Sequence, residues 1–203
     1  PNLLIMRTQY FGDISVAKVL DGADHFKAAI AFPDVDLNHF HQHHDWIRPF
    51  YDFENESIII STHSYVVKTP EFTAIVDTCI GNDKNRIGSG PIFKANKGVL
   101  SQWNNRNSPY LDNLIQSGIN PEEVDYVMCT HMHPDHVGWN TKLQDGRWVP
   151  TFPNAQYLFS QTELEGMQKQ TSNPFDEYIR LVYEDSVLPI IQSGQSMIIN
   201  NDF

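Results

Sequence analysis

The sequence predicts a layered domain of mixed helices and strands, α+β in class. Short runs of β-branched and aromatic residues alternate with segments that carry helix-start signals, and there are no internal repeats or low-complexity tracts. Of the 203 residues, 40% are hydrophobic and 12% are aromatic, which is enough material for one core. We therefore expect a single domain over residues 1–203.

Charge and composition exclude several classes of partner. A formal net charge of −11 argues against a nucleic-acid ligand, which usually requires a basic patch. No apolar run approaches the roughly 18–20 residues of a membrane span, and no signal peptide is recognisable. The two cysteines, Cys79 and Cys129, provide no disulfide framework. We expect a cytoplasmic protein.

Strand signals dominate the first part of the chain. Residues 14–20 predict a strand, and residues 57–68 and 72–77 predict two consecutive antiparallel strands with a tight connection. Between them, residues 23–56 show little periodicity and predict a long loop packed through its aromatic residues.

The predicted loop contains a histidine cluster from His39 to His44. A second metal site is one interpretation of this cluster. We favour a polar loop or a cap over a pocket, because no strand end or cysteine fixes the imidazole rings.

The next predicted element is a helix over residues 108–118. Ser108 is the expected N-cap, Pro109 the first helical position, and Gly118 the residue beyond the end. The apolar residues of this helix should share the face that packs on the sheet: Leu111, Leu114 and Ile115.

Turns and helices follow in the last third of the chain. Residues 81–106 predict a loop, and Asp145-Gly146 predicts a hairpin-like turn. Residues 156–159 predict a strand, and a helix should begin near Ser160 with capping-box spacing. A further helix should begin at Asn173-Pro174.

The most informative stretch is residues 130–139, which directly follows the apolar run of residues 124–129. That run predicts a short buried strand, so the residues that follow it are held by rigid backbone. Four side chains of metal-ligand type fall within six positions: His131, His133, Asp135 and His136.

The spacing of these residues favours convergence on one point. His131 and His133 are two positions apart and project to the same side in extended backbone. Pro134 should turn the chain and bring Asp135 and His136 to the same place. Imidazole nitrogens with a carboxylate suit zinc or another first-row divalent ion. The alternative is a polar surface turn, which four such residues after a strand disfavour.

Four residues elsewhere are candidates for supporting roles. Asp77 stands at the end of a predicted strand and either reaches the same site or caps its own turn. Trp139, Trp148 and Phe152 lie near the motif in the sequence. They either line an apolar substrate pocket or belong to the core.

These motifs resemble the metallo-β-lactamase superfamily of metal-dependent hydrolases. Residues 130–138 match its HxHxDH signature, and Asp77-Thr78-Cys79-Ile80-Gly81 occupies the place of its earlier Asp-Thr-Gly motif. Phe152-Pro153-Asn154-Ala155, followed by a strand and Glu163, adds to the likeness. The chain is most similar to the branch that contains methyl parathion hydrolase and the N-acyl homoserine lactonases, over roughly residues 14 to 200.

The resemblance implies an αββα sandwich with two metal ions, most commonly zinc, between its sheets. His131 and His133 would bind one ion, and Asp135 and His136 the other. Asp77 would steady the ligands, since a metal-bound imidazole needs a partner for its other ring nitrogen.

The sequence departs from the family pattern in two respects. Cys79 replaces the usual glycine, and we expect a packed thiol there rather than an additional ligand. The family also supplies a histidine, a bridging aspartate and a last histidine further along the chain, whereas every histidine here lies at or before His136. The chain therefore looks like the N-terminal half to two-thirds of the family domain, incomplete at its C-terminal end.

The implied function is that of a metallo-hydrolase. A metal-bound hydroxide would cleave an ester, lactone or phosphotriester bond in a small-molecule substrate, with Asp135 as the candidate for proton transfer. The alternatives are a glyoxalase-type thioesterase, a phosphodiesterase, and a truncated metal-binding fragment without activity. A homodimer is a possible oligomeric state.

Overall fold

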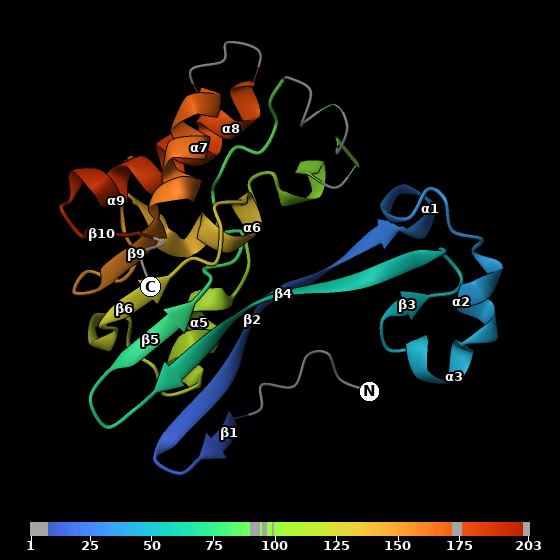
Figure 1. Ribbon diagram of the computed structural model, residues 1–203, viewed down its shortest axis with the longest axis horizontal. Helices are drawn as coiled ribbons and strands as arrows, with labels where there is room; N and C mark the ends of the chain where they lie inside the picture. Colours follow the sequence, from blue (N-terminus) through green and yellow to red (C-terminus); the bar gives the residue numbers. More distant parts are fainter. Residues whose placement is uncertain (1–7, 90–93, 95–96, 99, 172–175, 201–203) are drawn as a thin grey trace.

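The computed structural model describes residues 8–89, 94, 97–98, 100–171 and 176–200. Its main feature is a mixed sheet of eight described strands in the order β1-β2-β4-β5-β6-β9-β10, with β3 paired to β4 (Figure 1). These strands are β1 Thr8–Phe11, β2 Ile14–Lys27, β3 Tyr51–Asp52, β4 Ser57–Lys68, β5 Thr73–Val76, β6 Tyr126–Met128, β9 Gln156–Ser160 and β10 Ser196–Ile199. The predicted hairpin is present as a separate pair, β7 Thr141–Gln144 and β8 Arg147–Pro150.

Helices complete the α+β architecture, which confirms the predicted fold class. The described helices are α1 Ala28–Ala31, α2 Asn38–Gln42, α3 His44–Ile47, α5 Tyr110–Gln116, α6 Pro134–Val137, α7 Gln161–Thr171, α8 Glu177–Val182 and α9 Leu188–Gln192. Shorter turns are η1 Ser101–Trp103, η2 Pro121–Glu123, η3 Gly138–Asn140 and the π-helical η4 Tyr183–Val187. None of the described helices has the length and apolarity needed to cross a membrane.

Strands β2 and β4 form a long ribbon, so the prediction of a continuous loop over residues 23–56 is wrong. β2 continues to Lys27, which pairs with Ser57 of β4. Helices α1, α2 and α3 and strand β3 gather at the far end of this ribbon (Figure 1). The sequence pattern did not predict these elements. The end of β2 is defined by backbone pairing with β4, and the helices are very short, so neither produces a clear side-chain periodicity.

The histidine cluster belongs to this far end. The rings of His41 and His44 lie 5.2 and 4.6 Å from the ring of Phe53, and His43 lies 6.0 Å from Trp46. The cluster is therefore part of an aromatic lobe, and Figure 1 places this lobe away from α6 and its metal-ligand motif.

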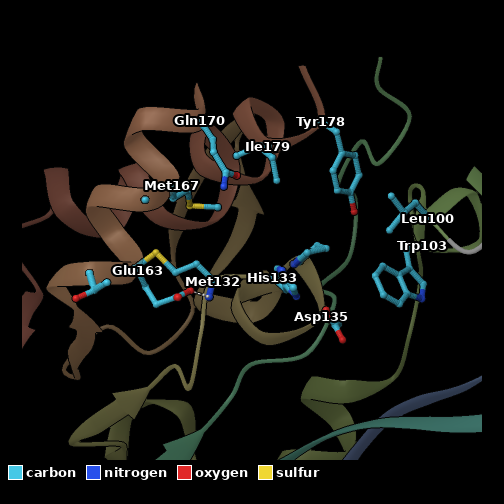
Figure 2. A pocket seen from close by; sticks show the side chains of 13 residues that line it. Leu100, Trp103, Met132, His133, Asp135, Glu163, Met167, Gln170, Tyr178 and Ile179 are labelled. Carbon is cyan, nitrogen blue, oxygen red and sulfur yellow. Dashed lines mark hydrogen bonds between the residues drawn. The ribbon is translucent and has the colours of Figure 1, made fainter. Parts of the chain in front are cut away.

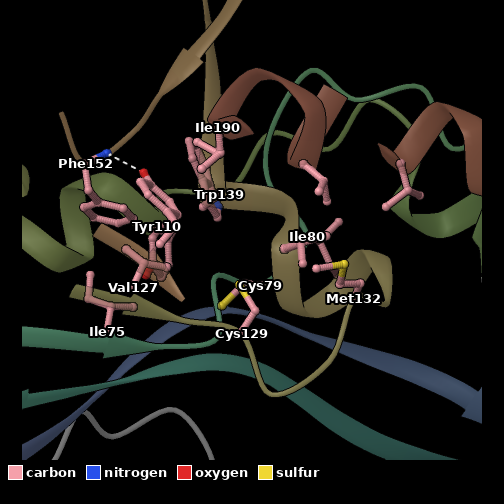
Figure 3. Packing of buried hydrophobic residues seen from close by; sticks show 14 of the residues in the cluster. Ile75, Cys79, Ile80, Tyr110, Val127, Cys129, Met132, Trp139, Phe152 and Ile190 are labelled. Carbon is pink, nitrogen blue, oxygen red and sulfur yellow. Dashed lines mark hydrogen bonds between the residues drawn. The ribbon is translucent and has the colours of Figure 1, made fainter. Parts of the chain in front are cut away.

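One face of the sheet is covered by helices. Val66, Ile75, Val127 and Tyr157 are cross-strand neighbours in register, and all four are buried. They belong to one apolar cluster with side chains of α5, α7, α8 and α9 (Figure 3). This cluster is the core of the domain.

The opposite face carries an uncovered apolar row. Tyr65, Val76, Met128, Leu158 and Met197 align across five strands, and Tyr65, Met128 and Met197 are 45%, 42% and 42% exposed. The buried strand predicted over residues 124–129 is therefore confirmed for one face of β6 only, because Val127 is buried whereas Met128 on the other face is exposed. In the implied αββα sandwich, a second sheet would cover this face.

Two details of the helix predictions also differ. The helix expected over residues 108–118 is the shorter α5, and Ser108 is not its N-cap, since its hydroxyl group donates to the carboxylate of Asp21. Ile115 is 59% exposed instead of packed on the sheet. The predicted helix start at Asn173-Pro174 lies outside the described residues.

Candidate metal centre

The candidate site lies where two neighbouring parallel strands end. β5 pairs with β6 in parallel, with Val76 opposite Met128, so the segments that follow them leave the sheet at the same edge. The amide of Asp77 donates to the carbonyl of Met128 at 2.9 Å, and the amide of Thr130 donates to the Asp77 carboxylate at 2.8 Å. Asp77 is thereby placed beside the HxHxDH segment.

Backbone hydrogen bonds hold the two segments together. The amide of Thr78 donates to the carbonyl of His136, and the amide of Gly138 to the carbonyl of Cys79, each at 2.8 Å. A Cβ atom at Gly138 would lie 1.9 Å from the carbonyl oxygen of Ile80. Glycine is therefore needed at position 138 for the close approach of the two chains.

Cys79 is a packed thiol, as the sequence predicts. Its side chain is buried, its sulfur lies 3.4 Å from the hydroxyl oxygen of Ser64, and burial raises its pKa well above the ordinary value. Its φ of 52° lies in the left-handed region, where glycine is the least strained residue. This geometry explains why a glycine would suit the position.

The four predicted ligand side chains gather beyond β6. The ring of His131 lies 4.5 Å from that of His133 and 3.9 Å from that of His136. Pro134 starts the single-turn helix α6, which brings Asp135 Oδ2 to 3.3 Å from His136 Nε2. Burial and the neighbouring imidazoles lower the pKa of His131, so this ring favours the neutral form that binds metal ions.

Asp77 contacts the histidine that it was expected to steady. His136 Nδ1 lies 2.9 Å from Asp77 Oδ2, which leaves Nε2 as the nitrogen on the side of Asp135. Burial opposes the charge on His136, but hydrogen bonds to Asp135 and Asp77 outweigh it and raise the pKa of His136 to about 9. Burial likewise opposes ionisation of Asp77, and hydrogen bonds from His136 and Thr130 nonetheless hold its pKa below the usual value.

The donors fit a divalent metal ion in type and proximity. Three imidazoles and one carboxylate are zinc-type ligands, and the carboxylate of Asp77 is the usual partner for the second nitrogen of a ligating histidine. The ring nitrogens of His136 are paired with Asp77 and Asp135 in this structure. Within the described parts of the chain, no group of three or more His, Cys, Asp or Glu side chains is arranged to hold a metal ion. Ion binding would therefore require these side chains to rearrange.

A cavity of about 460 Å³ adjoins the motif. Figure 2 shows Leu100 and Trp103 on one side of it, Met167 and Gln170 on the other, and His133 and Asp135 at its base. The remaining lining residues are Met132, Pro134, Thr162, Glu163, Gly166, Tyr178 and Ile179.

Apart from His133 and Asp135, the sequence did not identify this lining. Trp139 is buried in the core and stacks on Tyr110, Phe152 is fully buried, and Trp148 lies beneath Lys84, whose Nζ is 3.8 Å from the ring centroid. None of these three predicted pocket residues lines the cavity. Trp103 was missed because its segment has no periodic signal in the sequence.

Glu163 connects helix α7 to the motif. Its carboxylate accepts a hydrogen bond from the amide of Met132 at 3.1 Å (Figure 2). The capping-box spacing indicated a role at the helix start, whereas this contact supports the backbone between His131 and His133.

The structure is a mixed sheet with helices on one face and a His-rich motif at a strand end. These features define an α+β domain with a candidate metal site at the edge of its sheet. The sequence model described as the metallo-beta-lactamase superfamily matches residues 59–197. The chain therefore belongs to the metallo-β-lactamase superfamily. No curated protein sequence matches it.

Solved structures share this fold at low sequence identity. A probable metal-dependent hydrolase from Staphylococcus aureus is 22% identical with a TM-score of 0.67, over 96% of this chain and 62% of that one. The hydrolase AbOPH of the β-lactamase superfamily is 20% identical with a TM-score of 0.70, over 100% and 63%. The dizinc quorum-quenching lactonase AidC is 19% identical with a TM-score of 0.68, over 98% and 62%. The chain thus spans less than two thirds of the length of these structures.

Proposed function

We propose that this domain is part of a metal-dependent hydrolase that cleaves an ester, lactone or phosphotriester bond in a small molecule. The observation that carries the proposal is the gathering of His131, His133, Asp135 and His136 at one sheet edge, with Asp77 on His136. A dizinc lactonase and other hydrolases of similar fold support the choice of chemistry. We infer two zinc ions for the complete site.

The side chains of the site would have two functions, which are to hold the ions and to transfer a proton. The three histidines and Asp135 would hold the ions, which when bound activate water and polarise the substrate oxygen. Asp77 orients His136 through the nitrogen that does not face the site. Asp135 borders both His136 and the cavity, so its carboxylate could accept the proton that the attacking water releases and pass it to a leaving group held there.

The cavity supports a substrate with an apolar portion. Aromatic, leucine, isoleucine and methionine side chains make up much of its lining, and its volume of about 460 Å³ suits a small molecule. The net charge of −11 disfavours a nucleic-acid substrate and hence the phosphodiesterase alternative.

Removal of two ligands tests the proposal. The His131→Ala/His133→Ala variant should lose nearly all of the zinc that the wild-type protein retains, as measured by elemental mass spectrometry after metal-free purification and addition of zinc. The matched control is His39→Ala/His41→Ala, which removes two histidines of the same spacing on α2 and should retain wild-type zinc. Equal zinc in all three proteins contradicts the proposal, and so does the absence of zinc from a wild-type protein that includes the complete active site.

Asp77 provides a second prediction. Asp77→Ala should lower zinc affinity about 10- to 100-fold, because His136 loses the partner that orients its ring. Asp77→Asn should cost less, since asparagine tolerates the left-handed φ of 57° and keeps an acceptor for Thr130. Zinc titration against a chromophoric chelator measures both, and unchanged affinity in Asp77→Ala would refute the assigned role.

The expectation that residues 1–203 are a C-terminally incomplete domain stays a prediction. The uncovered row that includes Tyr65, Met128 and Met197 favours it, because apolar sheet faces of this kind are normally covered. We infer that the complete active site includes ligands from outside the described residues.

A further inference from the structure

A β-bulge in β2 determines where two acidic side chains point. The pairing register with β4 shifts between Leu20 and Gly22, so Asp21 is the additional residue. Residues three apart in a regular strand face opposite sides, but both Asp21 and Asp24 contact the same arginine, Arg106. The bulge has therefore turned both carboxylates toward one side of the sheet.

Arg106 lies against the bulge and connects the two carboxylates. Its Nη1 donates to both oxygens of Asp24 at 2.9 and 3.1 Å, and its Nε lies 3.9 Å from Asp21 Oδ2. A Cβ atom at Gly22 would lie 1.9 Å from Arg106 Nη2, so the absence of a side chain there makes room for the guanidinium group. The charges of this largely buried group are thus paired.

Each carboxylate also accepts a hydrogen bond from an indole. Trp139 Nε1 donates to Asp21 at 3.0 Å, and Trp103 Nε1 donates to Asp24 at 3.3 Å. Both tryptophans belong to the core cluster, and Trp103 also lines the cavity beside the metal-ligand motif. Phe26 meets the ring of Trp103 edge to face at 6.2 Å, so β2 contacts this indole at two points.

We infer that Asp24 is a positioning residue that fixes Trp103 as a wall of the substrate cavity. Trp103 is only 6% exposed, and its hydrogen bond to Asp24 selects how the packed indole is oriented in the wall of the cavity that His133 and Asp135 also line (Figure 2). Arg106 holds the Asp24 carboxylate in place through hydrogen bonds to both of its oxygens. The inference rests on the proposed function only in taking this cavity as the one that receives the apolar part of the substrate.

The test follows the indole itself and does not require catalysis. N-octylacetamide, an uncharged probe that is not an ester, is titrated into ¹⁵N-labelled protein, and the indole N–H resonance of Trp103 is assigned with Trp103→Phe. In the wild type the probe should shift this resonance in a saturable manner. Asp24→Ala should displace the Trp103 resonance before titration, leave that of Trp139 in place, and weaken probe binding about 5- to 10-fold.

Two further variants make the result specific. Asp24→Asn keeps an acceptor for the indole and should restore binding to within about 3-fold of wild type. Asp45→Asn removes one charge from the exposed surface of α3 and should change neither the resonance nor the affinity. The inference is overturned if Asp24→Ala leaves both quantities unchanged, if Asp24→Asn fails to restore binding, or if the wild-type Trp103 resonance does not respond to the probe.

The outcome separates this inference from the proposed function. Probe binding that depends on Asp24, in a protein that retains no zinc and hydrolyses no ester, supports the positioning role and contradicts the hydrolase proposal. If the protein shows zinc-dependent hydrolysis and the Trp103 resonance is unchanged in Asp24→Ala, the hydrolase proposal is supported and the positioning role is contradicted.

Discussion

Replacement of Asp185 with alanine is expected to lower the free energy of unfolding by about 3–5 kcal/mol. The Asp185 carboxylate accepts hydrogen bonds from Arg86 Nη1 at 2.6 Å and Nη2 at 3.1 Å, and it lies 3.5 Å from Lys84 Nζ. Both cations are fully buried. Removal of the carboxylate would leave them without a counter-charge in the interior, which costs far more than an exposed ion pair.

The two cations would respond differently to this loss. Burial lowers the pKa of Lys84 to about 7, although the Asp185 carboxylate opposes that shift, so Lys84 can release its proton. Arginine side chains remain charged in proteins, so Arg86 would account for most of the lost stability. The network joins the loop after β5 to the π-helical turn η4, so its disruption should also loosen the segment that follows Asp77.

Chemical denaturation with urea measures this effect. The control is Glu184→Ala, which removes the neighbouring carboxylate from an exposed pair with Arg180 and should cost less than about 1 kcal/mol. An unfolding free energy of Asp185→Ala equal to that of Glu184→Ala would show that the buried network does not stabilise the fold.

Gly138→Ala is expected to destabilise the protein by about 2 kcal/mol or more and to weaken zinc binding. The new Cβ atom would lie 1.9 Å from the carbonyl oxygen of Ile80 and 2.6 Å from the amide nitrogen of Gly81. Backbone cannot move aside as a flexible side chain does, so the segment after His136 must shift away from the segment after Asp77. The hydrogen bond between Gly138 and Cys79 would be lost with it.

The same substitution elsewhere provides the control. Gly166 lies inside α7 and has no atom within 4 Å of its added Cβ, so Gly166→Ala should stabilise the protein by about 0.5–1 kcal/mol. Thermal unfolding and zinc titration of both variants give the comparison. A Gly138→Ala protein as stable as Gly166→Ala would contradict the close-approach argument.

The sequence alone predicted the ligand types of the candidate metal site and several local elements of secondary structure. The ligand types and their spacing over residues 131–136 predicted a candidate metal site at a strand end, and the strands over residues 57–68 and 73–76 were predicted with nearly their observed bounds. These predictions depend only on residues close together in the chain, where backbone geometry and periodicity decide the outcome.

Tertiary structure alone decided how distant segments meet. The parallel register of Val76 with Met128 places Asp77 at His136, and the bulge at Asp21 places Asp24 at Trp103. The sequence predicted pocket residues near the motif in the chain, whereas the observed cavity takes its wall from segments far from it. Strand register and bulges arise from pairing across the sheet, and a single residue of shift reverses the direction of every side chain.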